Sequence, residues 1–128
     1  MRWLALGLLL CFACDASDRP RRRRLSLYCS AQPAWCDLLK NRFEQSSGIK
    51  VAMIRKSSGE ALAQIRAERQ SPTADVWWGG TGDGHLQAAE ANLSASYRSP
   101  RVDELHPWAR LDPKFRTTGI YMGALGFA

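Results

Sequence analysis

The sequence has few of the residues from which catalytic and metal sites are built. Its 128 residues include only two histidines, His85 and His106, and neither stands at metal-ligand spacing from a cysteine or another histidine. Asp75 and Asp83 flank a predicted strand, where an aspartate is more often a turn or cap residue than a general base. No nucleophile stands out either. We therefore predict a protein that is not an enzyme and that uses neither a metal site nor a cofactor.

The glycine motifs of nucleotide-binding proteins are also missing. The glycine-rich segment 79–83 is not followed by Gly-Lys-Ser/Thr, and no acidic residue stands at dinucleotide spacing behind a G-x-G-x-x-G. Residues 1–24 contain six of the 18 basic and two of the 12 acidic residues, so 12 basic residues face 10 acidic ones from Leu25 onward. This part, with a net charge of about +2, has no electrostatic footprint for nucleic acid, and the length allows one small domain at most.

The apolar segment near the N-terminus, residues 4–13, is shorter than the ~20 residues of a membrane-spanning helix. Small residues follow it, as they do in a signal peptide. We predict a signal peptide over residues 1–16 and an arginine-rich linker over residues 17–24, which implies export. Cleavage before Cys14, which would then be a lipid anchor at the membrane, and ordinary cleavage near Ala16 both stay open.

The four cysteines separate by position. Cys11 lies in the segment that we expect to be removed, and Cys14 is the candidate lipid anchor. Cys29 and Cys36 therefore remain in an oxidising compartment, where we predict a disulfide between them. The alternatives are two small buried apolar side chains or a redox pair, and the redox pair is disfavoured because the spacing is not C-x-x-C.

Strand-like and helix-like segments alternate three times along the chain. Alternating or continuous apolar patterns predict strands over residues 25–30, 49–54 and 74–78. Helices are predicted over residues 34–47, from Ser57 onward, and from about Asp83 onward. Short connections between such elements favour a parallel α/β sheet, whose ligands bind beyond the carboxyl ends of the strands.

Apolar spacing predicts which side chains of each helix are buried. The residues so predicted are Trp35, Leu38, Leu39 and Phe43 in the first helix, Leu62 and Ile65 in the second, and Leu86, Ala89 and Leu93 in the third. Gly48 is the expected C-cap of the first helix. The apolar segment 118–128 resembles a further strand, and its position at the last residue suggests a truncated chain.

Two turns are candidates for a binding site. Ser57, Ser58 and Gly59 precede a helix, where N–H groups, hydroxyls and the helix dipole favour an anion. The alternative is a capping box, in which Ser57 and Glu60 only satisfy the end of the helix. The second turn, residues 79–83, allows backbone to approach a ligand closely.

Several segments together resemble the periplasmic substrate-binding proteins of ABC importers, in the ferric-iron-binding-like branch. They are residues 27–30, 55–60, 74–83, 85–89 and 120–127. The resemblance implies a type II periplasmic-binding-protein fold, of which residues 25–128 would form an incomplete N-terminal lobe. It also implies a monomeric, periplasmic transport protein that delivers a small solute to a permease complex.

The resemblance implies ligand contacts as well. Iron-binding relatives use a histidine or acidic residue in this lobe, but Gln32 stands near the usual histidine and Gly80 near the usual glutamate. We therefore expect either an anionic organic solute or a ferric ligand. The candidate ligand-binding residues are Ser57, Ser58, Gly59, Gly80, Thr81, Tyr28 and Gln32. A fragment without a transport function is the alternative to this interpretation, and a small enzyme domain is less favoured.

Overall fold

The computed structural model describes residues 24–110 and 112–123. Three parallel strands, β1 (Arg24–Cys29), β2 (Lys50–Arg55) and β3 (Val76–Trp78), form a sheet in the order β2-β1-β3. The helices are α1 (Pro33–Ser47), α2 (Ser58–Ala67) and α3 (Gly82–Glu90), and two 3-10 turns, η1 (Val102–Glu104) and η2 (Pro107–Arg110), follow. The α/β class and the parallel sheet are confirmed.

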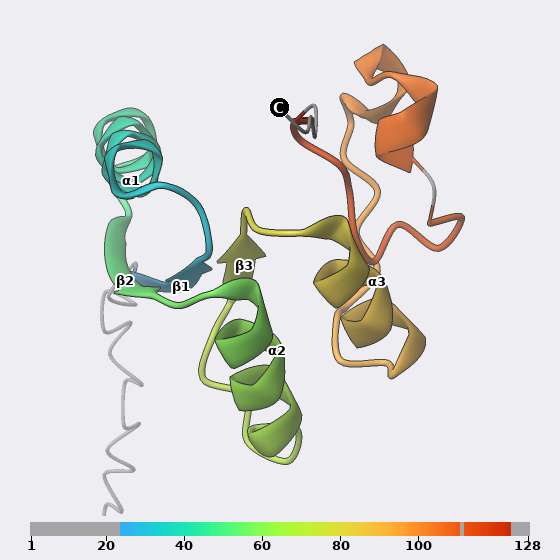
Figure 1. The fold of residues 1–128 in the computed structure, drawn as a ribbon. Coiled ribbons are helices and arrows are strands. Elements are labelled where there is room, and N and C mark those ends of the chain that lie inside the picture. The colour runs from blue at the N-terminus through green and yellow to red at the C-terminus, as the bar shows by residue number, and fades with distance from the viewer. Residues whose placement is uncertain (1–23, 111, 124–128) are drawn as a thin grey trace, which may run out of the picture.

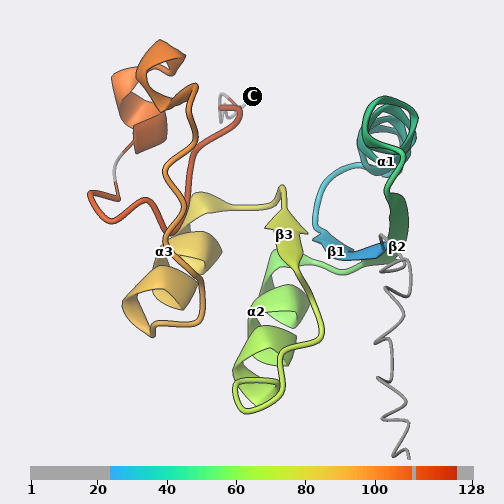
Figure 2. The same ribbon diagram turned by 180° about the vertical axis from the view of Figure 1, so that it is seen from behind.

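Helices α1 and α2 lie on opposite sides of the sheet, and α3 packs beside α2 (Figures 1 and 2). The alternation of side chains along β1 explains this arrangement. Leu25, Leu27 and Cys29 point toward α1, where Leu39 and Phe43 pack against them. Tyr28, one position out of phase, points to the other side and bonds to Glu68 just beyond α2.

The disulfide between Cys29 and Cys36 is confirmed, and it joins the end of β1 to the first turn of α1. Both side chains are fully buried in the core that Leu27 and Val51 complete. Gly48 ends α1 in the left-handed conformation, with φ of 68° and its N–H bonded to the Glu44 carbonyl, as a C-cap requires. This part of the core is therefore small and centred on the contact between β1 and α1.

Strand β3 is only three residues long, but bonds hold it to β1 at both ends. At its start the Ser26 N–H donates to the Asp75 carboxylate at 2.7 Å, and the Asp75 N–H donates to the Ser26 carbonyl at 2.9 Å. At its end the Ser30 N–H donates to the Trp78 carbonyl at 2.9 Å. These bonds fix where the glycine-rich turn after β3 begins.

The predicted buried stripe of α1 was partly wrong. Trp35 and Leu38 are 50% and 58% exposed, whereas Cys36 is buried and Leu39 and Phe43 are half-buried. The disulfide holds Cys36 against the sheet, and this contact turns Trp35 and Leu38 outward. In α3 the buried residues are Gly84, Ala88 and Ala89, and Leu86 is exposed.

The predicted C-terminal strand is also wrong over its described part. Residues 118–123 form no strand, because they do not pair with the open edge of β3. The Gly119 N–H instead donates to the Ala109 carbonyl, and Ile120, Tyr121 and Met122 are exposed. Residues 124–128, the predicted leader 1–16 and Cys14 lie outside the described residues.

Candidate ligand-binding site

The two candidate turns meet beyond the carboxyl ends of the strands. The Thr81 N–H donates to the Ser58 hydroxyl oxygen at 3.0 Å, which joins the turn after β3 to the start of α2. Gly79 and Gly80 have φ of 77° and 91°, in the region that favours glycine. A Cβ on Gly80 would overlap the Ser58 hydroxyl and lie 2.9 Å from Ser30 Cβ. The close approach of the turns therefore depends on glycine at position 80.

Ser57 has the capping role that its spacing predicts. Its hydroxyl accepts the Glu60 N–H at 3.3 Å, and its own N–H donates to the Glu60 carboxylate at 2.8 Å. The bond from the Ser57 N–H is also the main reason that the pKa of Glu60 lies below its ordinary value. Ser57 thus caps the N-terminus of α2, whereas the Ser58 hydroxyl faces the glycine turn.

Ser58 and Gly59 present donors at the start of α2. The N–H groups of the first turn of a helix have no partner within the helix. Among the described residues, the N–H groups of Ser58 and Gly59 have no acceptor, and the Ser58 hydroxyl, which accepts from Thr81, has none for its own hydrogen. Three donors consequently gather within two residues.

The Thr81 side chain has a different partner. Its hydroxyl lies near Asp83 and is the largest cause of a pKa of Asp83 below the ordinary value, and the N–H groups of Gly84 and Asp83 act in the same direction. The start of α3 therefore already has a carboxylate in place. An external anion at this edge is better accommodated next to Ser58 and Gly59 than next to Thr81.

Trp77 and His85 pack against each other beside the glycine turn. The Trp77 indole N–H donates to the Ser30 hydroxyl at 2.8 Å, and the rings of Trp77 and His85 stack with centroids 3.8 Å apart. His85 Nε2 lies 2.8 Å from the Gly79 carbonyl oxygen. Local sequence patterns do not predict these contacts, which join residues up to 47 positions apart.

Two other predicted ligand residues make none of the hydrogen bonds described above. Tyr28 is buried, and its hydroxyl bonds to Glu68 at 2.9 and 3.1 Å and to Thr73 at 3.0 Å. Gln32 is exposed at the start of α1, and its carbonyl accepts two N–H groups of that helix. The structure thus brings together Ser58, Gly59, Gly80 and Thr81, but not Tyr28.

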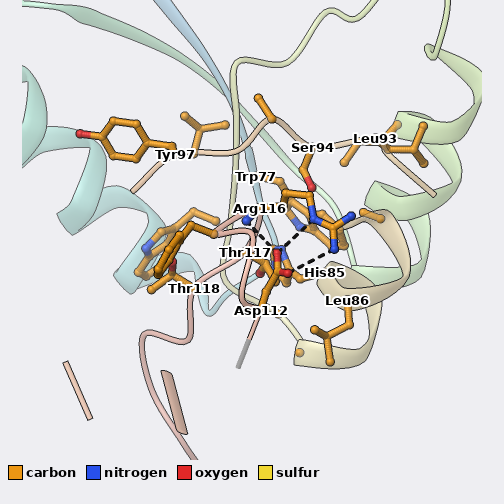
Figure 3. Close-up of a pocket in the computed structure, with 18 of the residues that line it drawn as sticks. Trp77, His85, Leu86, Leu93, Ser94, Tyr97, Asp112, Arg116, Thr117 and Thr118 are labelled. Atoms are coloured by element: carbon orange, nitrogen blue, oxygen red, sulfur yellow. Dashed lines mark hydrogen bonds and ion pairs between the residues drawn. The ribbon is translucent and has the colours of Figure 1, made fainter. Parts of the chain in front are cut away.

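A cavity of about 820 Å³ is lined by the glycine turn, β3, α3 and the C-terminal segment (Figure 3). Gly80 and Tyr121 line it, whereas Ser57, Ser58 and Gly59 do not. Arg116 and Asp112, which line this cavity, bond to each other. Arg116 donates to the Asp112 carboxylate from its backbone N–H at 2.7 Å and from its guanidinium at 3.2 Å. These bonds, led by those of the Arg116 side chain, lower the pKa of Asp112 to about 2.

Within residues 24–110 and 112–123, no helix is long and apolar enough to cross a membrane. The same residues contain no group of three or more histidine, cysteine, aspartate or glutamate side chains placed to hold a metal ion.

A sequence relative matches nearly the whole chain. No protein-family model matches the chain. A Haemophilus influenzae protein of uncharacterised function is 38% identical over 127 residues, which are 97% of this chain and 35% of that protein. The chain therefore spans about a third of the length of this relative.

Solved structures of periplasmic binding proteins are similar as well. AfuA from Actinobacillus pleuropneumoniae, with exogenous fructose-6-phosphate bound, is 45% identical with a TM-score of 0.64 over 66% of this chain and 26% of AfuA. The periplasmic binding protein P5PA is 34% identical with a TM-score of 0.67 over 73% of this chain and 30% of P5PA. Iron-bound HitA from Pseudomonas aeruginosa, at 23% identity and a TM-score of 0.64 over 67% of this chain and 28% of HitA, shows the fold alone. The chain is thus similar to a segment of these periplasmic binding proteins and has the fold of that segment.

Proposed function

We propose that this chain is part of an exported substrate-binding protein that captures a small anionic organic solute and delivers it to an ABC importer. The main support is the Ser58 hydroxyl, which accepts the Thr81 N–H and keeps its own hydrogen for a ligand. The N–H groups of Ser58 and Gly59 lie next to it. Hydrogen bonds to a charged ligand contribute about 1.5–3 kcal/mol each, so three donors suffice to place an anion without a lysine or arginine.

A phosphate group fits this set of donors. It has several acceptor oxygens and a negative charge that the start of a helix favours. The comparison that supports this choice is AfuA, which is 45% identical and was solved with fructose-6-phosphate bound. The ferric alternative has weaker support, because the iron-bound HitA structure is similar at only 23% identity.

The test is a titration with a hexose phosphate, with Ser58→Ala and Ser57→Ala compared side by side. We expect Ser58→Ala to weaken binding about tenfold or more, because it removes a bond to a charged group. We expect Ser57→Ala to leave affinity nearly unchanged and to lower stability by about 1 kcal/mol through the lost cap. Calorimetry gives the affinities and thermal unfolding the stabilities. Unchanged affinity in Ser58→Ala would show that the two turns are only structural.

A further inference from the structure

An aromatic pair stands beside the glycine turn. Trp35, in the first turn of α1, and Tyr121, near the end of the described chain, meet with ring centroids 5.5 Å apart and planes at 88°. They are 50% and 39% exposed, and neither belongs to the core around Leu27 and Cys29. Large aromatic side chains that come from distant elements and stay exposed are typical of the walls of small-molecule sites.

Like the Ser58 hydroxyl, the Tyr121 hydroxyl accepts a backbone N–H of the glycine turn. The Gly80 N–H donates to the Tyr121 oxygen at 3.1 Å, and the next N–H of the turn, that of Thr81, donates to Ser58 at 3.0 Å. Two successive amides therefore each donate to a hydroxyl. In Figure 1 the last described segment, in red, lies beyond the tip of β3, which agrees with this contact.

The hydrogen of the Tyr121 hydroxyl has only a poor acceptor within the described part of the chain. That acceptor is the Gly80 carbonyl at 3.4 Å, well beyond the 2.5–3.0 Å of a normal O–H···O bond. A negatively charged oxygen near the turn would accept the same hydrogen at a shorter distance. Tyr121 can thus exchange this long contact for a ligand bond without losing its bond from Gly80.

We propose that Trp35 and Tyr121 belong to the ligand site, where Tyr121 binds the phosphate group and Trp35 favours a phosphate ester with a carbohydrate body over inorganic phosphate. The Tyr121 hydroxyl donates to the phosphate group, together with Ser58. The exposed face of Trp35 packs against the carbohydrate body, whose C–H groups offer an apolar surface. This inference rests on the proposed function, since it assigns the two parts of one ligand to two neighbouring groups of side chains.

A purely structural role of Trp35 and Tyr121 predicts a different effect of their replacement on binding. If Trp35 and Tyr121 only held residues 119–123 against α1, their replacement would loosen that segment but would not distinguish one ligand from another. Selectivity between ligands therefore separates the two roles of Trp35, and a loss of affinity without a change in the spectrum of the free variant separates those of Tyr121.

The experiment uses isotope-labelled protein and two-dimensional NMR, which also measures millimolar affinities. Wild type, Trp35→Leu, Tyr121→Phe and Ser58→Ala are each titrated with a hexose 6-phosphate and with inorganic phosphate. Leu38→Ala is the matched control, because Leu38 is 58% exposed on the same helix. The spectra of the free variants also report whether each variant is folded.

We expect Trp35→Leu to weaken hexose phosphate binding about fivefold and to change phosphate binding less than about twofold. Tyr121→Phe should weaken both by about tenfold, because it removes a bond to the shared charged group. Leu38→Ala should change neither.

Two results would overturn the inference in different ways. If Ser58→Ala loses hexose phosphate affinity while Trp35→Leu and Tyr121→Phe bind like wild type, the proposed site stands and the aromatic pair is only a brace. If wild type binds neither ligand, or if Ser58→Ala has no effect, the proposed function fails and the inference fails with it.

Discussion

Removal of the disulfide between Cys29 and Cys36 should destabilise this protein strongly for its size. The bond closes a loop with a sequence separation of 7, for which the chain-entropy relation gives about 2.4 kcal/mol at 25 °C. Folded domains of this size are stable by only about 5–15 kcal/mol, so the bond supplies a substantial part of the total. Its position in a core of few buried side chains makes the loss harder to compensate.

Urea unfolding of the oxidised and the reduced protein measures the effect. The comparison is made in a Cys11→Ala, Cys14→Ala background, so that Cys29 and Cys36 are the only thiols. With a slope of about 1–2 kcal/mol per molar urea, the midpoint should fall by about 1–2 M on reduction. A Cys29→Ala, Cys36→Ala variant should unfold near the midpoint of the reduced protein or below it, because the sulfur atoms are also lost from the core.

Equal midpoints before and after reduction would refute this reasoning. So would two free thiols, counted under denaturing and non-reducing conditions, in protein taken from an oxidising compartment. The second result would mean that the bond does not form, and the first that it forms without restricting the unfolded chain.

Three further predictions concern other parts of the molecule. Because the pKa of Asp112 is lowered to about 2, chiefly by Arg116, its contribution to stability is present above about pH 4, the range of an unfolded aspartate, and is lost as the pH falls toward 2. Asp112→Asn should therefore unfold at a lower temperature than wild type at pH 7 and show a smaller fall between pH 4 and 2; equal slopes would contradict this. Gly80→Ala should lower the melting temperature and the ligand affinity together, whereas Gly82→Ala, with open space around its Cα, should preserve ligand affinity. Mass spectrometry of exported protein should find the mature N-terminus within residues 13–17, with diacylglyceryl on Cys14 if the lipoprotein route is used, and an intact Met1 would reject processing.

The elements of this fold were largely predictable because local chemistry determines them. The S-x-x-E spacing of Ser57 and Glu60 gives a capping box in the structure, and Gly48 ends α1 as a C-cap. The contact between the turns at Ser58 and Thr81 was predictable too, because parallel strands place their following turns at one edge of the sheet.

Contacts that depend on tertiary packing could not be predicted. The apolar spacing of α1 does not reveal that Cys36 faces the sheet and that Trp35 turns outward, because the disulfide determines the rotation of the helix. Tyr121 was assigned to a strand from its apolar neighbours, yet its hydroxyl bonds to Gly80, 41 positions earlier. A pattern over adjacent residues contains no information on such distant partners.

The double attachment of β3 to β1 has a consequence for the energy of binding. A strand of three residues would by itself slide easily along its neighbour, but a shift by one residue would break the Asp75 bonds at one end and the Ser30 bond at the other. The donors after β3 are therefore preorganised, and the entropy of ordering them is lost during folding rather than during ligand capture. Asp75, whose hydrogen bonds among the described residues go to Ser26, should for this reason influence affinity from the opposite end of β3.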